Sequence, residues 1–167
     1  MNVTIFADAS YCNELRVGGY GFWVACERGK KAGGGRLKTN DVSSSTVAEM
    51  MALANALHCA IVHGLVLDND IVLLQTDCMA AIDAFEGRRT RLIQQELQII
   101  AFMHRLIEKG KLKLTYRHVK GHTGNGDRRS VTNHLCDKRA KKGLNAARTA
   151  KRLEGIRNKL EKPNGSH

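Results

Sequence analysis

The sequence has no run of about 18 uncharged apolar residues, which is the length that a membrane-spanning helix needs. Its first residues, MNVTIFADAS, contain neither the basic segment nor the long apolar segment of a secretory signal peptide. No two of its five cysteines are spaced as C-x-x-C, and their odd number and wide scatter argue against a disulfide framework or a zinc site. We therefore expect a cytoplasmic protein with reduced thiols that does not bind membranes.

Acidic residues are scarce beside basic ones, with 16 Asp and Glu against 27 Lys and Arg and a net charge of +11. An excess of this size favours polyanionic partners, most often nucleic acid. The segment from Lys138 to the end holds ten of the basic residues but only two acidic ones, Glu154 and Glu161, which is a net charge of +8. We expect a globular domain over residues 1–143 and a basic helical extension over 144–167 with a flexible end.

Hydrophobic periodicity predicts an α/β domain with three strands first and helices and strands alternating afterwards. The glycine-rich segment RGKKAGGG is predicted to be a turn between the second and third strands. The expected strands cover 2–10, 18–27, 35–38, 70–78 and 111–119. The expected helices cover 43–64, 79–87, 92–110 and 135 to about 160, with the basic connector RRTR before the third of them.

Four carboxylates lie where regular elements begin or end. Asp8 and Asp77 end apolar strand segments, Glu49 lies near the start of the first long helix, and Asp137 lies near the start of the last. Side chains from strand ends and adjoining helix termini converge at one edge of an α/β sheet. Clustered carboxylates favour Mg²⁺ or Mn²⁺, and two such ions about 4 Å apart activate water for in-line displacement at phosphorus. The pattern therefore suggests a phosphodiesterase.

Each of these residues also has a simpler interpretation when it is taken alone. Asp8 and Asp77 fit turn positions, Glu49 fits a favourable interaction with a helix dipole, and Asp137 fits a helix N-terminus. The hypothesis therefore depends on the order and context of all four.

That order resembles the ribonuclease H type 1 family. IFADAS is similar to its first aspartate motif, GGYGFWV to its second strand, and AEMMALANAL to the helix that carries its glutamate. LLQTDC resembles its third acidic strand end, and HVKGHTG followed by NHLCDKRA resembles its histidine loop and last aspartate. The resemblance covers about Val3 to Ala140.

The resemblance implies a ribonuclease H-like mixed five-stranded sheet, with an antiparallel meander of three strands plus two parallel strands, flanked by helices. It implies that residues 1–143 form a catalytic domain in which Asp8, Glu49, Asp77 and Asp137 bind two Mg²⁺ ions, which Mn²⁺ can replace. His122 would assist proton transfer or product release, although alone it reads as an exposed loop histidine. The implied activity is hydrolysis of the RNA strand of RNA–DNA hybrids, leaving 3′-hydroxyl and 5′-phosphate ends. Separately from the resemblance, we expect a monomer without a small-molecule cofactor.

The resemblance also implies substrate contacts around the acidic residues. Candidates are Ser10, Ser44, Ser45, Thr46, Asn133, Arg88 and Arg89. The serines before Glu49 also fit helix capping. His118 lies in an alternating strand and is assigned no chemistry, and the segment YCNELRVGG departs from the family's Gly-Asn-Pro-Gly turn. The cationic tail fits phosphate contacts, and it equally fits a solvated helix.

Two alternatives remain open. A noncatalytic module that binds RNA–DNA hybrids would share the basic charge, and a junction resolvase of the same fold would share the carboxylates. The KGHTG segment and the spacing of the motifs argue against the resolvase.

Overall fold

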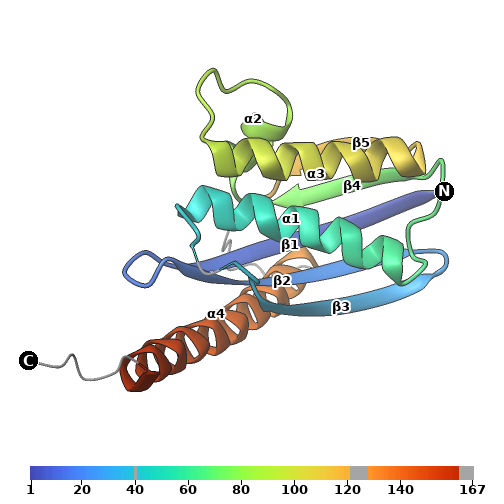
Figure 1. The fold of residues 1–167 in the computed structure, drawn as a ribbon. Coiled ribbons are helices and arrows are strands. Elements are labelled where there is room, and N and C mark those ends of the chain that lie inside the picture. Colours follow the sequence, from blue (N-terminus) through green and yellow to red (C-terminus); the bar gives the residue numbers. More distant parts are fainter. Residues whose placement is uncertain (40, 121–127, 162–167) are drawn as a thin grey trace, which may run out of the picture.

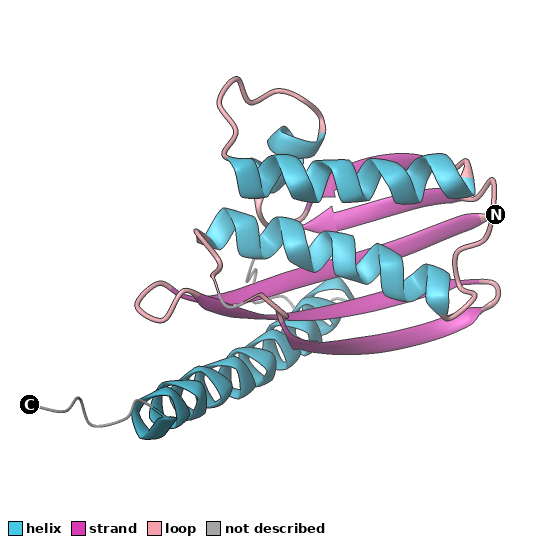
Figure 2. Cartoon of the chain, in the orientation of Figure 1, coloured by secondary structure: helices cyan, strands magenta, loops and turns pink. Residues whose placement is uncertain are grey.

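The structure is a computed structural model that describes residues 1–39, 41–120 and 128–161 of the 167. Five strands and four helices lie within the described residues (Figures 1 and 2). In chain order they are β1 (Asn2–Cys12), β2 (Val17–Cys26), β3 (Gly29–Arg36), α1 (Ser45–Val62), β4 (Ile71–Thr76), α2 (Met79–Phe85), α3 (Gln94–Gly110), β5 (Lys113–His118) and α4 (Arg128–Glu161).

The strands form one mixed sheet in the order β3-β2-β1-β4-β5. β1 and β2, and β2 and β3, pair antiparallel, whereas β1 and β4, and β4 and β5, pair parallel. This confirms the predicted meander of three strands plus two parallel strands. Because β1 and β4 run in the same direction, the residues that end them lie at the same edge of the sheet.

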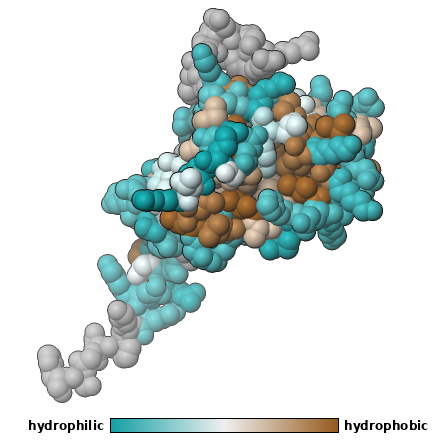
Figure 3. All heavy atoms as spheres, turned by 90° about the horizontal axis from the view of Figure 1, so that it is seen from above, coloured by the Kyte–Doolittle hydropathy of each residue, from teal (hydrophilic) through white to brown (hydrophobic). Residues whose placement is uncertain are grey.

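Helices cover both faces of this sheet. α1, α2 and α3 lie on one side, and α4 crosses β1, β2 and β3 on the other (Figure 1). Val3, Ile5 and Ala7 alternate along β1 and are fully buried in the core together with α1 residues such as Leu53 and Leu57. Seen from above the view of Figure 1, apolar residues gather in patches on the surface and hydrophilic residues surround them (Figure 3).

α1 is long and apolar enough, by length and composition, to cross a membrane. Core helices pass the same test, and half of the residues of α1 are buried inside the domain. Its apolar character is therefore accounted for by packing against the sheet and α3.

The third strand differs from the prediction. β3 covers Gly29–Arg36, so the segment expected to be a turn is the strand itself, and Cys26 pairs with Gly29 across a shorter connection. A Cβ added to Gly33 would lie 2.7 Å from the ring of Phe22. A Cβ added to Gly34 would lie 2.3 Å from a backbone oxygen of β2. The glycines are therefore required by close packing within the sheet, which a turn-based interpretation of Gly-Gly-Gly misses.

The last helix begins at Arg128 rather than near Leu135 and continues to Glu161 without a break at the predicted boundary after residue 143. Leu144 and Ala147, just beyond that boundary, are buried against Val17 of β2. The expected flexible end falls on residues 162–167, which lie outside the described part of the chain. The division into a domain and an extension stays a prediction.

Replacement by alanine is expected to have opposite effects on stability at two glycines of α4. A Cβ at Gly143 would lie 2.1 Å from the backbone oxygen of Gly35, whereas nothing lies within 4 Å of a Cβ at Gly155. We expect Gly143→Ala to lower the free energy of unfolding by about 2 kcal/mol or more, because strand and helix must separate. Gly155→Ala should leave it unchanged or raise it by up to about 1 kcal/mol through helix propensity. Urea unfolding of both variants checks this, and equal effects would contradict the close packing of α4 on the sheet.

Candidate active site

Three of the four predicted carboxylates meet where β4, and with it the pairing between β1 and β4, ends. One carboxylate oxygen from each of Asp8, Glu49 and Asp77 lies within 4.8 Å of the others. Asp8 belongs to β1, Asp77 follows the last residue of β4, and Glu49 reaches the cluster from the second turn of α1. Parallel pairing of β1 with β4 and packing of α1 on β1 bring these distant residues together.

Burial and mutual repulsion make this cluster electrostatically unfavourable without a cation. Burial, followed by the charges of Asp77 and Asp137, raises the pKa of Asp8 to about 7. Burial, followed by the charges of Asp8 and Asp77, raises the pKa of Glu49 to about 9. Oε1 of Glu49 accepts a hydrogen bond from the Ala9 N–H at 3.2 Å, whereas Oε2 is buried without a partner among the described residues. A hard divalent cation would satisfy this oxygen, so the site fits Mg²⁺ or Mn²⁺.

The raised pKa values predict how stability depends on pH. Between the unfolded values, 3.8 for Asp8 and 4.5 for Glu49, and the folded values of about 7 and about 9, the folded protein retains protons that the unfolded chain has released. Without metal, these two groups therefore make the free energy of unfolding fall as the pH rises through this window. Mg²⁺ competes with those protons, so it should raise Tm more at pH 9 than at pH 6.

Thermal melting with and without Mg²⁺ at both pH values measures this linkage. If the Mg²⁺ concentration were set separately at about 100 times the Kd for each pH, the stabilisation would be about 2.7 kcal/mol at both pH values. The melts at the two pH values are therefore compared at one fixed Mg²⁺ concentration. Glu49→Gln should weaken the difference between the two pH values because an amide does not titrate. An Mg²⁺-dependent rise in Tm that is the same at pH 6 and pH 9 would count against metal binding by these carboxylates.

Asp137 lies near this cluster but is not one of the three residues within 4.8 Å. Its charge contributes to the raised pKa of Asp8. Asp137 Oδ2 accepts a hydrogen bond from Nζ of Lys141 at 2.8 Å, one turn along α4, and this contact raises the pKa of Lys141. α4 can approach here because Gly21 has no side chain, since a Cβ there would lie 2.1 Å from the backbone oxygen of Cys136.

His118 makes a contact that the sequence did not indicate. Its Nε2 lies 3.0 Å from the carbonyl oxygen of Asp77, so this nitrogen carries the proton and donates. β4 and β5 pair in a register that places His118 opposite Thr76, the residue before Asp77. His118 thereby helps to hold the backbone that carries one of the three carboxylates. His122, predicted to be catalytic, lies outside the described residues.

Five of the residues predicted to contact the RNA strand belong to elements that also carry the acidic residues, or lie directly before one. Ser44 is the N-cap of α1, and its Oγ accepts a hydrogen bond from the Val47 N–H at 3.1 Å, so its capping role is confirmed. Ser45 and Thr46 form the first turn of α1, before Glu49. Ser10 lies two residues beyond Asp8 on β1, and Asn133 lies one turn before Asp137 on α4.

The two arginines predicted to contact substrate already have partners within the protein. Arg88 pairs with Asp83 at 2.6 Å and also with Glu86. Arg89 donates to Glu96, which is 3% exposed, at 2.5 Å. Oε2 of Glu96 in turn accepts from the Ile93 N–H at the start of α3, so Arg89 also stabilises this helix end. Substrate binding by either arginine stays a prediction.

Comparisons with known proteins agree with this arrangement. The family model described as RNase H matches residues 1–145. No curated protein sequence matches the chain. Among solved structures, RNase H1 from the archaeon Halobacterium salinarum is similar, with a TM-score of 0.67, 18% identity, and coverage of 87% of this chain and 99% of that chain.

Two further solved structures are similar to this chain. The N-terminal RNase H domain of a Mycobacterium tuberculosis protein has a TM-score of 0.62 and 21% identity, over 89% of this chain and 97% of that chain. LC11-RNase H1, which was isolated from compost and solved in complex with an RNA/DNA hybrid, has a TM-score of 0.69 and 16% identity, over 87% of this chain and 98% of that chain. At these identities the structures establish the fold.

Proposed function

Because this chain belongs to the ribonuclease H family, we propose that it is an endoribonuclease that hydrolyses the RNA strand of RNA–DNA hybrids by two-metal-ion catalysis. The products would carry 3′-hydroxyl and 5′-phosphate ends. The observation that supports this proposal most strongly is the cluster of Asp8, Glu49 and Asp77, with carboxylate oxygens within 4.8 Å of one another. A related structure, LC11-RNase H1, was solved with an RNA/DNA hybrid.

The acidic residues would hold two Mg²⁺ ions, with Asp137 as the fourth ligand. Bound divalent ions would activate the attacking water and stabilise the leaving oxygen of an in-line displacement at phosphorus. Asp8 is buried and Glu49 is half-buried with its Oε2 inside the protein, so they give the site a fixed frame, whereas Asp77 is exposed to solvent. Glu49 is oriented by the Ala9 N–H, and the backbone of Asp77 is held by His118.

Lys141 would balance the charge of Asp137, the fourth carboxylate of the site. In the absence of metal it neutralises Asp137 across one helical turn, and its own charge also lowers the pKa of Asp8. A cation held by the acidic residues would take over part of this role, which would leave the exposed Lys141 able to contact a substrate phosphate. Ser45 and Thr46 would lie beside the 2′-hydroxyl groups that distinguish RNA from DNA.

The experiment that tests the proposed activity compares nucleic acids and metals. Labelled RNA–DNA hybrid, duplex RNA, duplex DNA, single-stranded RNA and a four-way junction are each incubated with the protein in Mg²⁺, Mn²⁺ or EDTA. We expect cutting of the hybrid only, with either metal, and none in EDTA. Binding to the hybrid without cutting would replace the proposal with a noncatalytic module, and cutting of the junction would replace it with a resolvase.

A further inference from the structure

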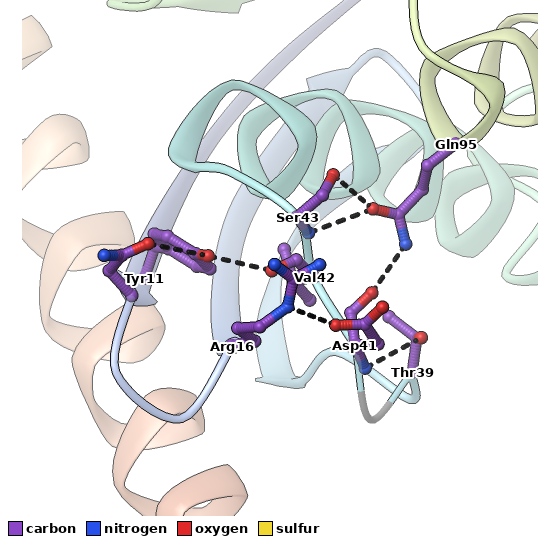
Figure 4. Close-up of polar contacts among 8 residues, drawn as sticks. Tyr11, Arg16, Thr39, Asp41, Val42, Ser43 and Gln95 are labelled. Carbon is purple, nitrogen blue, oxygen red and sulfur yellow. Dashed lines mark hydrogen bonds and ion pairs between the residues drawn. The ribbon is translucent and has the colours of Figure 1, made fainter.

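The segment formed by residues 41–43, directly before α1, is held by side chains from two other elements (Figure 4). Tyr11 of β1 donates its hydroxyl to the carbonyl oxygen of Val42 at 2.8 Å. Gln95 of α3 accepts from both the N–H and the hydroxyl of Ser43, at 3.0 and 2.7 Å, through its Oε1. The same side chain donates through Nε2 to the carbonyl oxygen of Asp41 at 2.7 Å. One glutamine therefore bridges both sides of Val42.

The connection between β1 and β2 supplies further contacts. The carbonyl oxygen of Arg16 accepts from the Val42 N–H at 2.7 Å. The Arg16 guanidinium pairs with the Asp41 carboxylate, and this contact lowers the pKa of Asp41. Val42 itself is fully buried in a small apolar cluster with Leu37 and Val47. Tyr11 and Arg16 both lie in YCNELRVGG, the segment that departs from the ribonuclease H pattern.

These contacts exceed what the start of a helix requires. Ser44 already caps α1 through its own hydroxyl. The additional bonds satisfy the backbone groups of Asp41, Val42 and Ser43 from outside the segment, which fixes the path of the chain into Ser45 and Thr46. Glu49 is oriented independently by the Ala9 N–H. A loss of these contacts would therefore move the first turn of α1 more than the carboxylate cluster.

We propose that Tyr11 and Gln95 are positioning residues for recognition of the RNA strand: they hold residues 41–43 so that Ser44, Ser45 and Thr46 contact the 2′-hydroxyl groups of the hybrid in a fixed geometry. This inference rests on the proposed function, because it concerns the substrate of the same site. It assigns the two residues an effect on hybrid binding and none on the chemical step.

The test uses two substitutions that remove hydrogen bonds but keep the size of the side chain. Gln95→Met removes three bonds, and Tyr11→Phe removes the bond to Val42. Gln98→Met, one turn along α3, and Tyr20→Phe, on the neighbouring strand, are matched controls. In the described part of the chain, the side chains that bond to residues 41–43 are those of Tyr11, Arg16, Thr39 and Gln95, and neither control residue is among them. KM and kcat for the hybrid are measured at 25 °C together with Ki for duplex DNA as a competitor and with Tm.

We expect Gln95→Met to raise KM for the hybrid about tenfold and Tyr11→Phe to raise it about threefold, since each lost bond weakens binding by a small factor. kcat should stay within about twofold of the wild type for both, because only binding changes. Ki for duplex DNA, which has no 2′-hydroxyl groups, should not change. Both controls should match the wild type.

Other results would overturn the inference in recognisable ways. If the wild type cuts the hybrid but the variants keep its KM, or show only a lower Tm, the contacts are merely structural and the proposed function stands. If Ki for duplex DNA rises as much as KM, the lost contact is to phosphate rather than to the RNA sugar. If the wild type neither binds nor cuts the hybrid, the proposed function is wrong, and this inference, which rests on it, is wrong as well.

Discussion

Asp77→Asn is expected to abolish cleavage of the RNA strand while the protein stays folded and still binds the hybrid. The amide keeps the volume of the side chain but removes the charge that a divalent ion needs. Loss of about 4 kcal/mol of transition-state stabilisation corresponds to a rate about 10³-fold lower. Asp77 is exposed, so its replacement leaves the buried core intact.

The control for this variant is Asp68→Asn, which makes the same change at an exposed aspartate in the connection between α1 and β4. Its cleavage rate should equal that of the wild type. Single-turnover kinetics with saturating hybrid, together with a binding titration in Ca²⁺ or EDTA, separate chemistry from affinity. If Asp77→Asn cleaved the hybrid at the wild-type rate, the assignment of Asp77 to the catalytic site would be wrong.

Shortening the chain after Ala150 is expected to weaken hybrid binding and to flatten its salt dependence. The removed segment holds Lys151, Arg152, Arg157, Lys159 and Lys162 against two glutamates. Each lost phosphate contact reduces the slope of log K against log salt concentration by about 0.9. We expect the slope to change by about 2, which corresponds to the loss of about two phosphate contacts. Cutting after Ala150 rather than after Gly143 preserves Leu144 and Ala147, which are buried against β2.

The end of α4 projects beyond the sheet and is mostly hydrophilic on the face seen in Figure 3. Replacing Arg152, Arg157 and Lys159 by Gln should reproduce much of the effect of the truncation on hybrid binding and on its salt dependence. The matched control replaces three exposed lysines outside the tail by Gln: Lys30 of β3, Lys109 of α3 and Lys113 of β5. An unchanged salt slope in the tail variant, or an equal change in both, would show that the tail is not a specific phosphate-binding arm. Phosphate contacts do not explain the exposed Leu153, Ile156 and Leu160 of this tail.

The carboxylate cluster could be predicted from the sequence because its members follow recognisable strand and helix signals. Asp8 and Asp77 end apolar strand segments, and parallel pairing of those strands places such ends together. The strength of the repulsion among them could not be predicted, since it depends on burial. The raised pKa values of Asp8 and Glu49 come first from the burial of these groups inside the folded domain.

The regions where the prediction was wrong depend on long-range packing. Gly33 and Gly34 of β3 resemble a turn when only neighbours in sequence are considered, but they lie against Phe22 and the backbone of β2. The bridging role of Gln95 joins residues 54 positions apart, and no local pattern marks a glutamine on an amphipathic helix for such a contact. His118 likewise reaches Asp77 only through the register of β4 and β5.

The central claim is that these carboxylates bind divalent ions that direct hydrolysis of RNA opposite DNA. The most direct test is a hybrid with different labels on its RNA and DNA strands, incubated with the wild type and with Asp77→Asn in Mg²⁺ or EDTA, followed by analysis of the new ends. We predict cuts in the RNA strand only, by the wild type in Mg²⁺ only, with 3′-hydroxyl and 5′-phosphate ends. Cuts in the DNA strand, cuts that persist in EDTA, or 2′,3′-cyclic phosphate ends would contradict it.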